Sequence, residues 1–131
     1  MNSIKNIVDS STSKIYTGGV SDEIINNAEL QLKLTFASDY KELLSNYGSL
    51  IIGGDEFLGI DTVNYDIVKA TEEARNMYPD FPKSMYVIEN MYIDGILLVQ
   101  NTQGAIFVFQ SRKTIQKVKD NLKDYLMELL M

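Results

Sequence analysis

Three short apolar runs in the second half of the chain constrain the fold more than any other feature. They occupy residues 85–88, 96–99 and 105–109, and turn-forming residues separate them: Asp94-Gly95 in the first gap and residues 101–104 in the second. Such turn residues are typical of antiparallel hairpins. The middle run does not alternate between apolar and polar residues, which predicts a central strand that is covered on both faces.

Five other segments are predicted to be helical from their apolar spacing and capping residues. They lie at residues 4–8, 21 to about 32, 38–47, about 65–78, and from about 114 onward. Ser21 and Ser38 are the expected N-caps of the second and third helices. Gly48 is expected in the left-handed conformation that ends the third helix. Residues 16–19 are expected to form a loop.

Two further strands are predicted on either side of a glycine turn at Gly53-Gly54. They occupy residues 50–52 and 57–60. The expected order of elements is therefore α-α-α-β-β-α-β-β-β-α. This order predicts an α+β fold in which an antiparallel sheet of about five strands packs against helices. We expect one domain over residues 1–131, with a helix and a loop in residues 1–20.

The composition excludes several kinds of catalytic site. The 131 residues include no Cys and no His, so Cys nucleophiles, Ser-His-Asp triads and Cys/His zinc sites are impossible. We predict no catalytic residues, no metal site and no cofactor. The first residues are too polar for a signal peptide, and no apolar run approaches the roughly 18 residues of a membrane span. The expected location is the cytoplasm, without membrane attachment.

The charge of the chain is negative and unevenly distributed. Twelve basic and 18 acidic side chains give a net charge of -6. Residues 49–111 contain nine acids and three bases, which accounts for a charge of -6 in this segment alone. A strongly acidic protein is a poor candidate for binding nucleic acid, because that binding depends on Lys and Arg at the phosphates. Acidity on its own is equally consistent with a role in solubility.

Residues 53–57 read Gly-Gly-Asp-Glu-Phe, the signature of the GGDEF diguanylate cyclases. In that family the glycines let the backbone approach the nucleotide, and the acids help to hold the metal. The family also has an acidic strand upstream, where this sequence predicts the helix at residues 38–47. A five-residue match without its context is weak. We therefore interpret the segment as a glycine turn followed by an acidic edge, and keep a carboxylate- or metal-dependent enzyme as a remote alternative.

Taken in order, several segments resemble the SUKH superfamily of small α+β domains. Residues 36–44 (Phe-Ala-Ser-Asp-Tyr-Lys-Glu-Leu-Leu) resemble the entry of the family's central helix, and Asn46-Tyr47-Gly48 resembles its end. Residues 52–60 resemble the family's glycine hairpin, and residues 125–130 resemble its closing helix. Ala37 replaces the usual proline, and the family's frequent tryptophans are missing.

This resemblance implies a binding module that needs no catalytic residue. The family includes bacterial immunity proteins, which neutralise a toxin that is often a nuclease or deaminase, and a fungal regulator of cell-wall synthesis. We therefore expect a protein partner, with an immunity protein as the first hypothesis and a regulatory adaptor as the second. The expected binding surface combines acidic and aromatic side chains: Asp55, Glu56, Asp61, Tyr65, Asp66, Tyr92 and Asp94.

Overall fold

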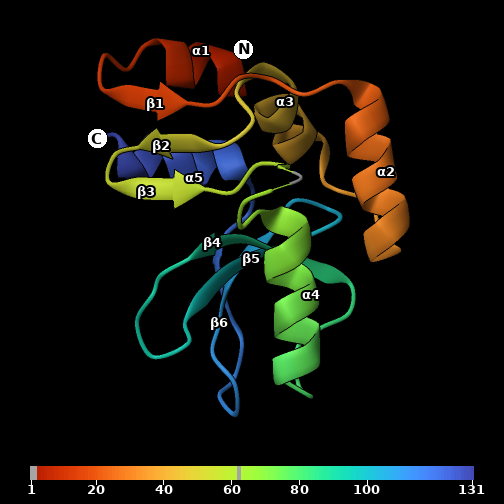
Figure 1. Cartoon of the computed structure of the whole chain (residues 1–131). Helices are drawn as coiled ribbons and strands as arrows, with labels where there is room; N and C mark the ends of the chain where they lie inside the picture. Colours follow the sequence, from red (N-terminus) through yellow and green to blue (C-terminus); the bar gives the residue numbers. More distant parts are fainter. Residues whose placement is uncertain (1–2, 62) are drawn as a thin grey trace.

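The three apolar runs form neighbouring strands in the computed structural model, which describes residues 3–61 and 63–131 (Figure 1). β4 (Met85–Asn90), β5 (Leu97–Asn101) and β6 (Ile106–Phe109) pair in antiparallel fashion, and β7 (Gln116–Lys119) pairs with β6 to complete a sheet of order β4-β5-β6-β7. Residues 97–100 of β5 are all buried. This confirms the prediction that the middle run is an interior strand.

A second antiparallel sheet has the order β1-β2-β3. It consists of β1 (Lys14–Tyr16), β2 (Leu50–Ile52) and β3 (Asp55–Phe57). Gly53 and Gly54 form the predicted turn between β2 and β3, with φ angles of 59° and 84° that favour glycine. The turn is tighter than predicted, because β3 begins immediately after it, at residue 55.

The α+β class is confirmed, but the expected single sheet of about five strands is wrong. The two sheets contain three and four strands, and the observed order of elements is α-β-α-α-β-β-α-β-β-β-β-α. β1 lies in the expected N-terminal loop, and its three residues become a strand only by pairing with distant β2. β7 lies where the last helix was predicted to begin. The prediction was wrong because the spacing of Ile115, Val118 and Leu122 also fits a helical period.

Within the described residues, five helices accompany the sheets: α1 (Ile4–Asp9), α2 (Asp22–Leu32), α3 (Ser38–Asn46), α4 (Ile67–Met77) and α5 (Leu122–Leu129). Ser21 is the N-cap of α2 as predicted, and its hydroxyl accepts a hydrogen bond from the Ile24 N–H. The expected cap at Ser38 is wrong: Ala37 occupies the N-cap position of α3, and its side chain makes no capping hydrogen bond. Gly48 has the predicted left-handed conformation, with φ of 72°.

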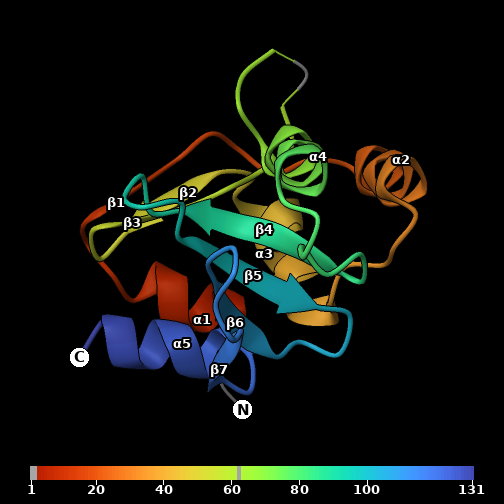
Figure 2. The ribbon, with the colours of Figure 1, turned by 90° about the horizontal axis from the view of Figure 1, so that it is seen from below.

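The helices cover the four-stranded sheet from two sides. Figure 2 shows α2 and α4 on one side of β4 and β5, and α1 and α5 on the other. α4 packs directly on β4, while α1, α3 and α5 contact one another. Buried aromatic rings fill the space between these layers, with Tyr86 of β4 in edge-to-face contact with Phe36 and Tyr40.

A buried polar network links the helices to the sheet. The Tyr86 hydroxyl accepts from the Ala37 N–H at 2.8 Å and donates to Gln100 Oε1 at 2.6 Å. Gln100 Nε2 donates to Asp39 Oδ1 at 3.0 Å, and Asp39 Oδ2 accepts from the Leu122 N–H at 2.9 Å. Because buried polar groups are costly when unpaired, these bonds specify how α3 and α5 meet β4 and β5.

The two sheets meet where the end of β3 passes β4. The Leu58 N–H donates to the Ile88 carbonyl at 2.8 Å, and the Glu56 N–H donates to Glu89 Oε2 at 3.1 Å. The register between β4 and β5 shifts between Val87 and Glu89, which marks a β-bulge at Ile88. Bulges re-aim the side chains around them. This bulge lies directly before Glu89, whose carboxylate is buried in the fold.

Candidate partner-binding face

The turn between β4 and β5 presents an aromatic side chain to solvent. Tyr92 is 71% exposed, and its φ of 56° places it in the left-handed region that few non-glycine residues adopt. Its N–H donates to Asn90 Oδ1 at 2.8 Å, and Asn90 Nδ2 donates to the Tyr65 hydroxyl at 3.1 Å. The rings of Tyr65 and Tyr92 lie 6.4 Å apart. Two predicted site residues distant in the sequence therefore form one aromatic pair.

Asp94 belongs to the same turn as Tyr92 and is exposed to solvent. It too has a left-handed backbone, with φ of 53°, and Gly95 follows it with φ of 69°. The Asp94 carbonyl accepts a hydrogen bond from Gln110 Nε2 at 2.9 Å. The turn is thus held by its backbone, and the carboxylate of Asp94 stays outward.

Asp66 has an internal role and is only 3% exposed. It is the N-cap of α4: Oδ1 accepts from the Lys69 N–H at 2.8 Å, and Oδ2 accepts from the Asp61 N–H at 2.8 Å. Its negative charge also lies at the end of the helix dipole that favours anions. The carboxylate is therefore occupied by the fold and not presented to a partner.

Asp61 organises the loop before α4. Its Oδ1 accepts from the Val63 N–H at 2.8 Å, and its Oδ2 accepts from Asn64 Nδ2 at 3.0 Å. These hydrogen bonds lower the pKa of Asp61, so its carboxylate is ionised at neutral pH. Lys69 Nζ donates to the Asp61 carbonyl at 2.9 Å. The loop therefore holds a charged carboxylate in a defined position near Tyr65.

Asp55 and Glu56 lie on β3 beside a buried acid that belongs to β4. Glu89 is 5% exposed, and its Oε1 has no hydrogen-bond partner among the described residues. Asp55 is half-buried, and its Oδ2 accepts from the Tyr125 hydroxyl at 3.0 Å. Burial raises the pKa of Glu89 to about 8, and the nearby Asp55 carboxylate raises it in the same direction. Glu89 is therefore largely protonated at neutral pH.

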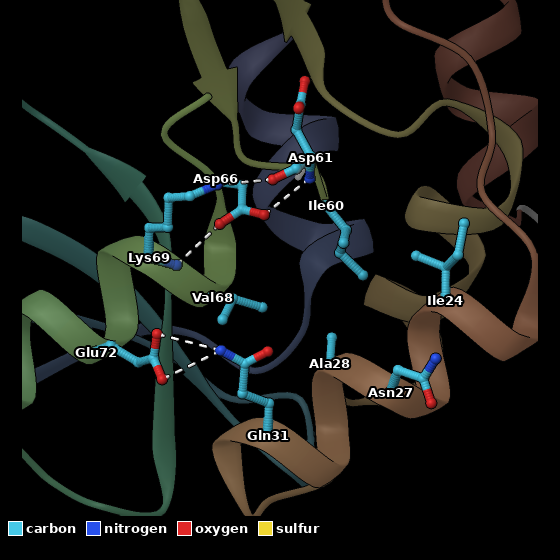
Figure 3. A pocket seen from close by; sticks show the side chains of 10 residues that line it. All are labelled: Ile24, Asn27, Ala28, Gln31, Ile60, Asp61, Asp66, Val68, Lys69 and Glu72. Atoms are coloured by element: carbon cyan, nitrogen blue, oxygen red, sulfur yellow. Dashed lines mark hydrogen bonds between the residues drawn. The ribbon is translucent and has the colours of Figure 1, made fainter. Parts of the chain in front are cut away.

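A groove of 420 Å³ between α2 and α4 adjoins the same loop (Figure 3). Its apolar lining includes Ala28 of α2, Val68 of α4 and Ile60. On its rim, Gln31 Nε2 donates to the Glu72 carboxylate at 3.3 and 3.4 Å. Asp61 and Asp66 also line the groove, although Figure 3 shows the Asp61 carboxylate pointing away from the apolar side chains.

Of the seven predicted site residues, Asp66 is buried and Asp55 is half-buried and bonded to Tyr125, which leaves five others that are at least partly exposed. We call them the acidic–aromatic face: Glu56, Asp61, Tyr65, Tyr92 and Asp94. Within this group, Glu56 bonds to Glu89, Tyr65 and Tyr92 both bond to Asn90, and Asp61 bonds to Asp66. None of its three carboxylates takes part in an ion pair within residues 3–61 and 63–131. The other two predicted residues, Asp55 and Asp66, bond within the fold.

Glu89 and Asn90 are the site residues that sequence reasoning missed. The predicted apolar run stopped at residue 88, whereas β4 continues through Asn90. The only signal was an acid directly after four apolar residues. It was missed because a charged residue in that position is easily interpreted as the end of a strand. The structure instead places this acid inside, and the amide of Asn90 positions the aromatic pair.

Over residues 3–61 and 63–131, His, Cys, Asp and Glu side chains form no group of three suited to a metal ion. Over the same ranges, no helix is both long enough and apolar enough to span a bilayer. Gly53 of the Gly-Gly-Asp-Glu-Phe segment has a packing role, because a Cβ at this position would lie 2.9 Å from Leu129 Cγ.

Comparison with known proteins gives a family match and one partial relative. The model of the family SUKH_5, described as SMI1-KNR4 cell-wall, matches residues 1–131. A DNA ligase of Enterobacteria phage T6 is 30% identical over 111 residues, which cover 78% of this chain and 21% of the ligase. The chain thus spans about a fifth of that relative's length. Because the family model matches residues 1–131, this chain belongs to the SUKH (SMI1-KNR4) family.

Proposed function

We propose that this protein is a non-catalytic cytoplasmic immunity protein that neutralises a cognate toxin by binding it directly. Membership of the SUKH family supports a binding module, and the resemblance to bacterial immunity proteins supports a toxin as the partner. The partner's contact surface is basic, as expected for an enzyme that acts on nucleic acid. The acidic–aromatic face covers that surface and keeps the toxin from its substrate.

The observation that carries this proposal is the exposure of Tyr92 beside carboxylates that have no ion-pair partner. A tyrosine that is 71% exposed on a left-handed turn is costly for the free protein. Tyrosines are enriched among the residues that dominate binding energy at interfaces. The carboxylates of Glu56, Asp61 and Asp94 add long-range attraction, which accelerates association with a basic partner.

A regulatory adaptor is the second candidate, because the matching family model carries the description SMI1-KNR4 cell-wall. In that case the acidic–aromatic face binds another protein of the cell that produces this chain. A carboxylate-dependent enzyme remains the third and remote alternative. Formation of cyclic di-GMP from GTP and Mg²⁺ by the purified protein would establish that alternative.

The decisive experiment is co-expression with the toxin domain encoded beside the gene in the native genome. The wild-type protein is expected to restore growth and to bind the purified toxin domain in calorimetry. Tyr92→Ala and Glu56→Lys/Asp94→Lys are expected to lose protection. Glu23→Lys/Glu73→Lys is the matched control, because Glu23 on α2 and Glu73 on α4 are exposed acids outside the face. Full protection by both face variants would refute the proposed surface, and absence of wild-type binding would refute the immunity function.

A further inference from the structure

A second cavity, of 390 Å³, lies at the C-terminal ends of α2 and α4, the lower ends of both helices in Figure 1. It includes none of the residues of the acidic–aromatic face. Its lining combines apolar and cationic side chains, among them Leu32, Lys33, Arg75, Tyr78, Phe81 and Lys83. A volume of this size and a largely apolar lining with a few polar groups are typical of sites for small molecules.

The charge of this cavity is opposite to that of the whole chain. Three of its lining residues, Lys33, Arg75 and Lys83, are cationic, and no acidic residue lines it. The four ion pairs formed by residues 3–61 and 63–131 involve none of the three. In a protein with a net charge of -6, this is a local concentration of positive charge that no carboxylate neutralises.

The guanidinium of Arg75 is positioned but incompletely paired. Its Nη2 donates to the Lys83 carbonyl at 3.0 Å, which ties α4 to the loop that follows it. Its Nε is buried and has no hydrogen-bond partner among the described residues. A buried donor without a partner destabilises the fold, so this arrangement is maintained at a cost. An anion in the cavity would engage other N–H groups of this guanidinium, which has five donors in all.

The aromatic wall of the cavity is held rigidly by the core. The ring of Phe81 packs against Phe109 with centroids 5.1 Å apart, and the ring of Tyr78 lies 5.8 Å from the same residue. The Phe81 N–H also donates to the Tyr78 carbonyl at 3.0 Å. A preformed wall lowers the entropic cost of binding a flat apolar group.

Helix-dipole complementarity explains only part of this arrangement. Lys33 is the C-cap of α2, with φ of 58°, and Arg75 lies in the last turn of α4, positions where cations are favourable. Lys83 is on neither helix, and the dipole argument does not account for the aromatic wall. Because the two helix ends repel anions, attraction in the cavity depends on the three side chains.

We propose that this cavity binds a small organic anion. Its carboxylate or phosphate group meets Lys33, Arg75 and Lys83, and its flat apolar body rests on Tyr78 and Phe81. Arginine suits both kinds of anion, because its planar donors match the geometry of carboxylates and phosphates. This site is independent of the proposed toxin-binding face.

The test is an NMR titration of ¹⁵N-labelled full-length protein with three probes that share one ring system. They are 2-naphthoate, 2-naphthyl phosphate and the neutral 2-naphthalenemethanol. Both anions are expected to shift the amides of residues 32–33, 75–78, 80–81 and 83; Pro79 and Pro82 have no N–H. The neutral probe is expected to bind at least about tenfold more weakly, a factor equal to about 1.4 kcal/mol. The relative affinity of the two anions distinguishes a carboxylate site from a phosphate site.

Charge-removing variants complete the test. Lys33→Gln/Lys83→Gln is expected to weaken binding of both anions at least about tenfold, the same factor of about 1.4 kcal/mol. This pair leaves the hydrogen bond from Arg75 to the backbone of residue 83 intact. Lys113→Gln/Lys123→Gln removes the same charge elsewhere and is expected to bind like wild type. Scattered shifts, equal binding of the neutral probe, or unchanged affinity of the first pair would overturn the proposal.

Discussion

Replacing Glu89 with glutamine is expected to remove a pH dependence from the stability of the protein. Glutamine has the shape of a protonated glutamate, so its amide oxygen can still accept from the Glu56 N–H. Unlike glutamate, it cannot ionise. The titratable groups that face Glu89 come from three elements and are unchanged in this variant: Asp55 and Glu56 of β3, Tyr125 of α5, and Tyr40 of α3.

The magnitude follows from the pKa of Glu89, which is about 8 in the folded protein and ordinarily 4.5. Between these values the folded state holds a proton that the unfolded state releases, so the free energy of unfolding falls as pH rises. At about 1.36 kcal/mol per pH unit, the full difference is about 5 kcal/mol. Water near the half-buried Asp55 screens part of this effect, so we expect about 2 to 3 kcal/mol.

Urea unfolding followed by circular dichroism at pH 5 and pH 9 provides the measurement. Relative to wild type, Glu89→Gln should gain about 2 to 3 kcal/mol of stability between the two pH values. Glu23→Gln is the matched control, because Glu23 is exposed on α2, and this variant should follow the wild-type profile. If Glu89→Gln and wild type lose stability in parallel as pH rises, Glu89 is not protonated in the folded protein, and the reasoning fails.

Three further outcomes are expected. Thr71→Val should lower the free energy of unfolding by about 1–3 kcal/mol in urea titrations, because Thr71 Oγ1 accepts from the buried Val87 N–H at 3.0 Å. Ser21→Ala should cost about 1 kcal/mol in the same assay, since it removes the N-cap of α2; a cost near zero would contradict that role. Glu56→Lys/Asp94→Lys should slow association with a basic partner and reduce its salt dependence in stopped-flow measurements, and unchanged rates would remove these carboxylates from the interface.

The central strands could be predicted from the sequence because the signals that specify them, apolar runs and turn residues, lie within the segments themselves. Residues 96–99 have no polar alternation, and the turns on either side have glycine where the backbone needs it. β1 and β7 could not be predicted in the same way. Each is a short edge strand, mostly exposed, whose conformation depends on a partner that the local pattern does not reveal.

Of the predicted site residues, Tyr65 and Tyr92 lie together in the fold as one aromatic pair; that a partner binds them and the predicted acids stays a prediction. Which of these side chains are free was not predictable. Asp66 has the same residue type as Asp61 and lies five positions away, yet it caps α4 from a buried position. The cationic cavity had no sequence signal, because Lys33 and Lys83 come together only through the packing of α2 against α4.

The junction between the sheets has a mechanical consequence. Glu56 belongs to the sheet of β1–β3, whereas Tyr92 follows the last residue of β4 in the other sheet. A partner that contacts both residues bridges the two sheets and restrains their motion relative to each other. The Leu58 N–H crosses this junction to the Ile88 carbonyl. Its rate of amide hydrogen exchange therefore reports how firmly the two halves of the molecule are held together, and binding that spans them should slow it.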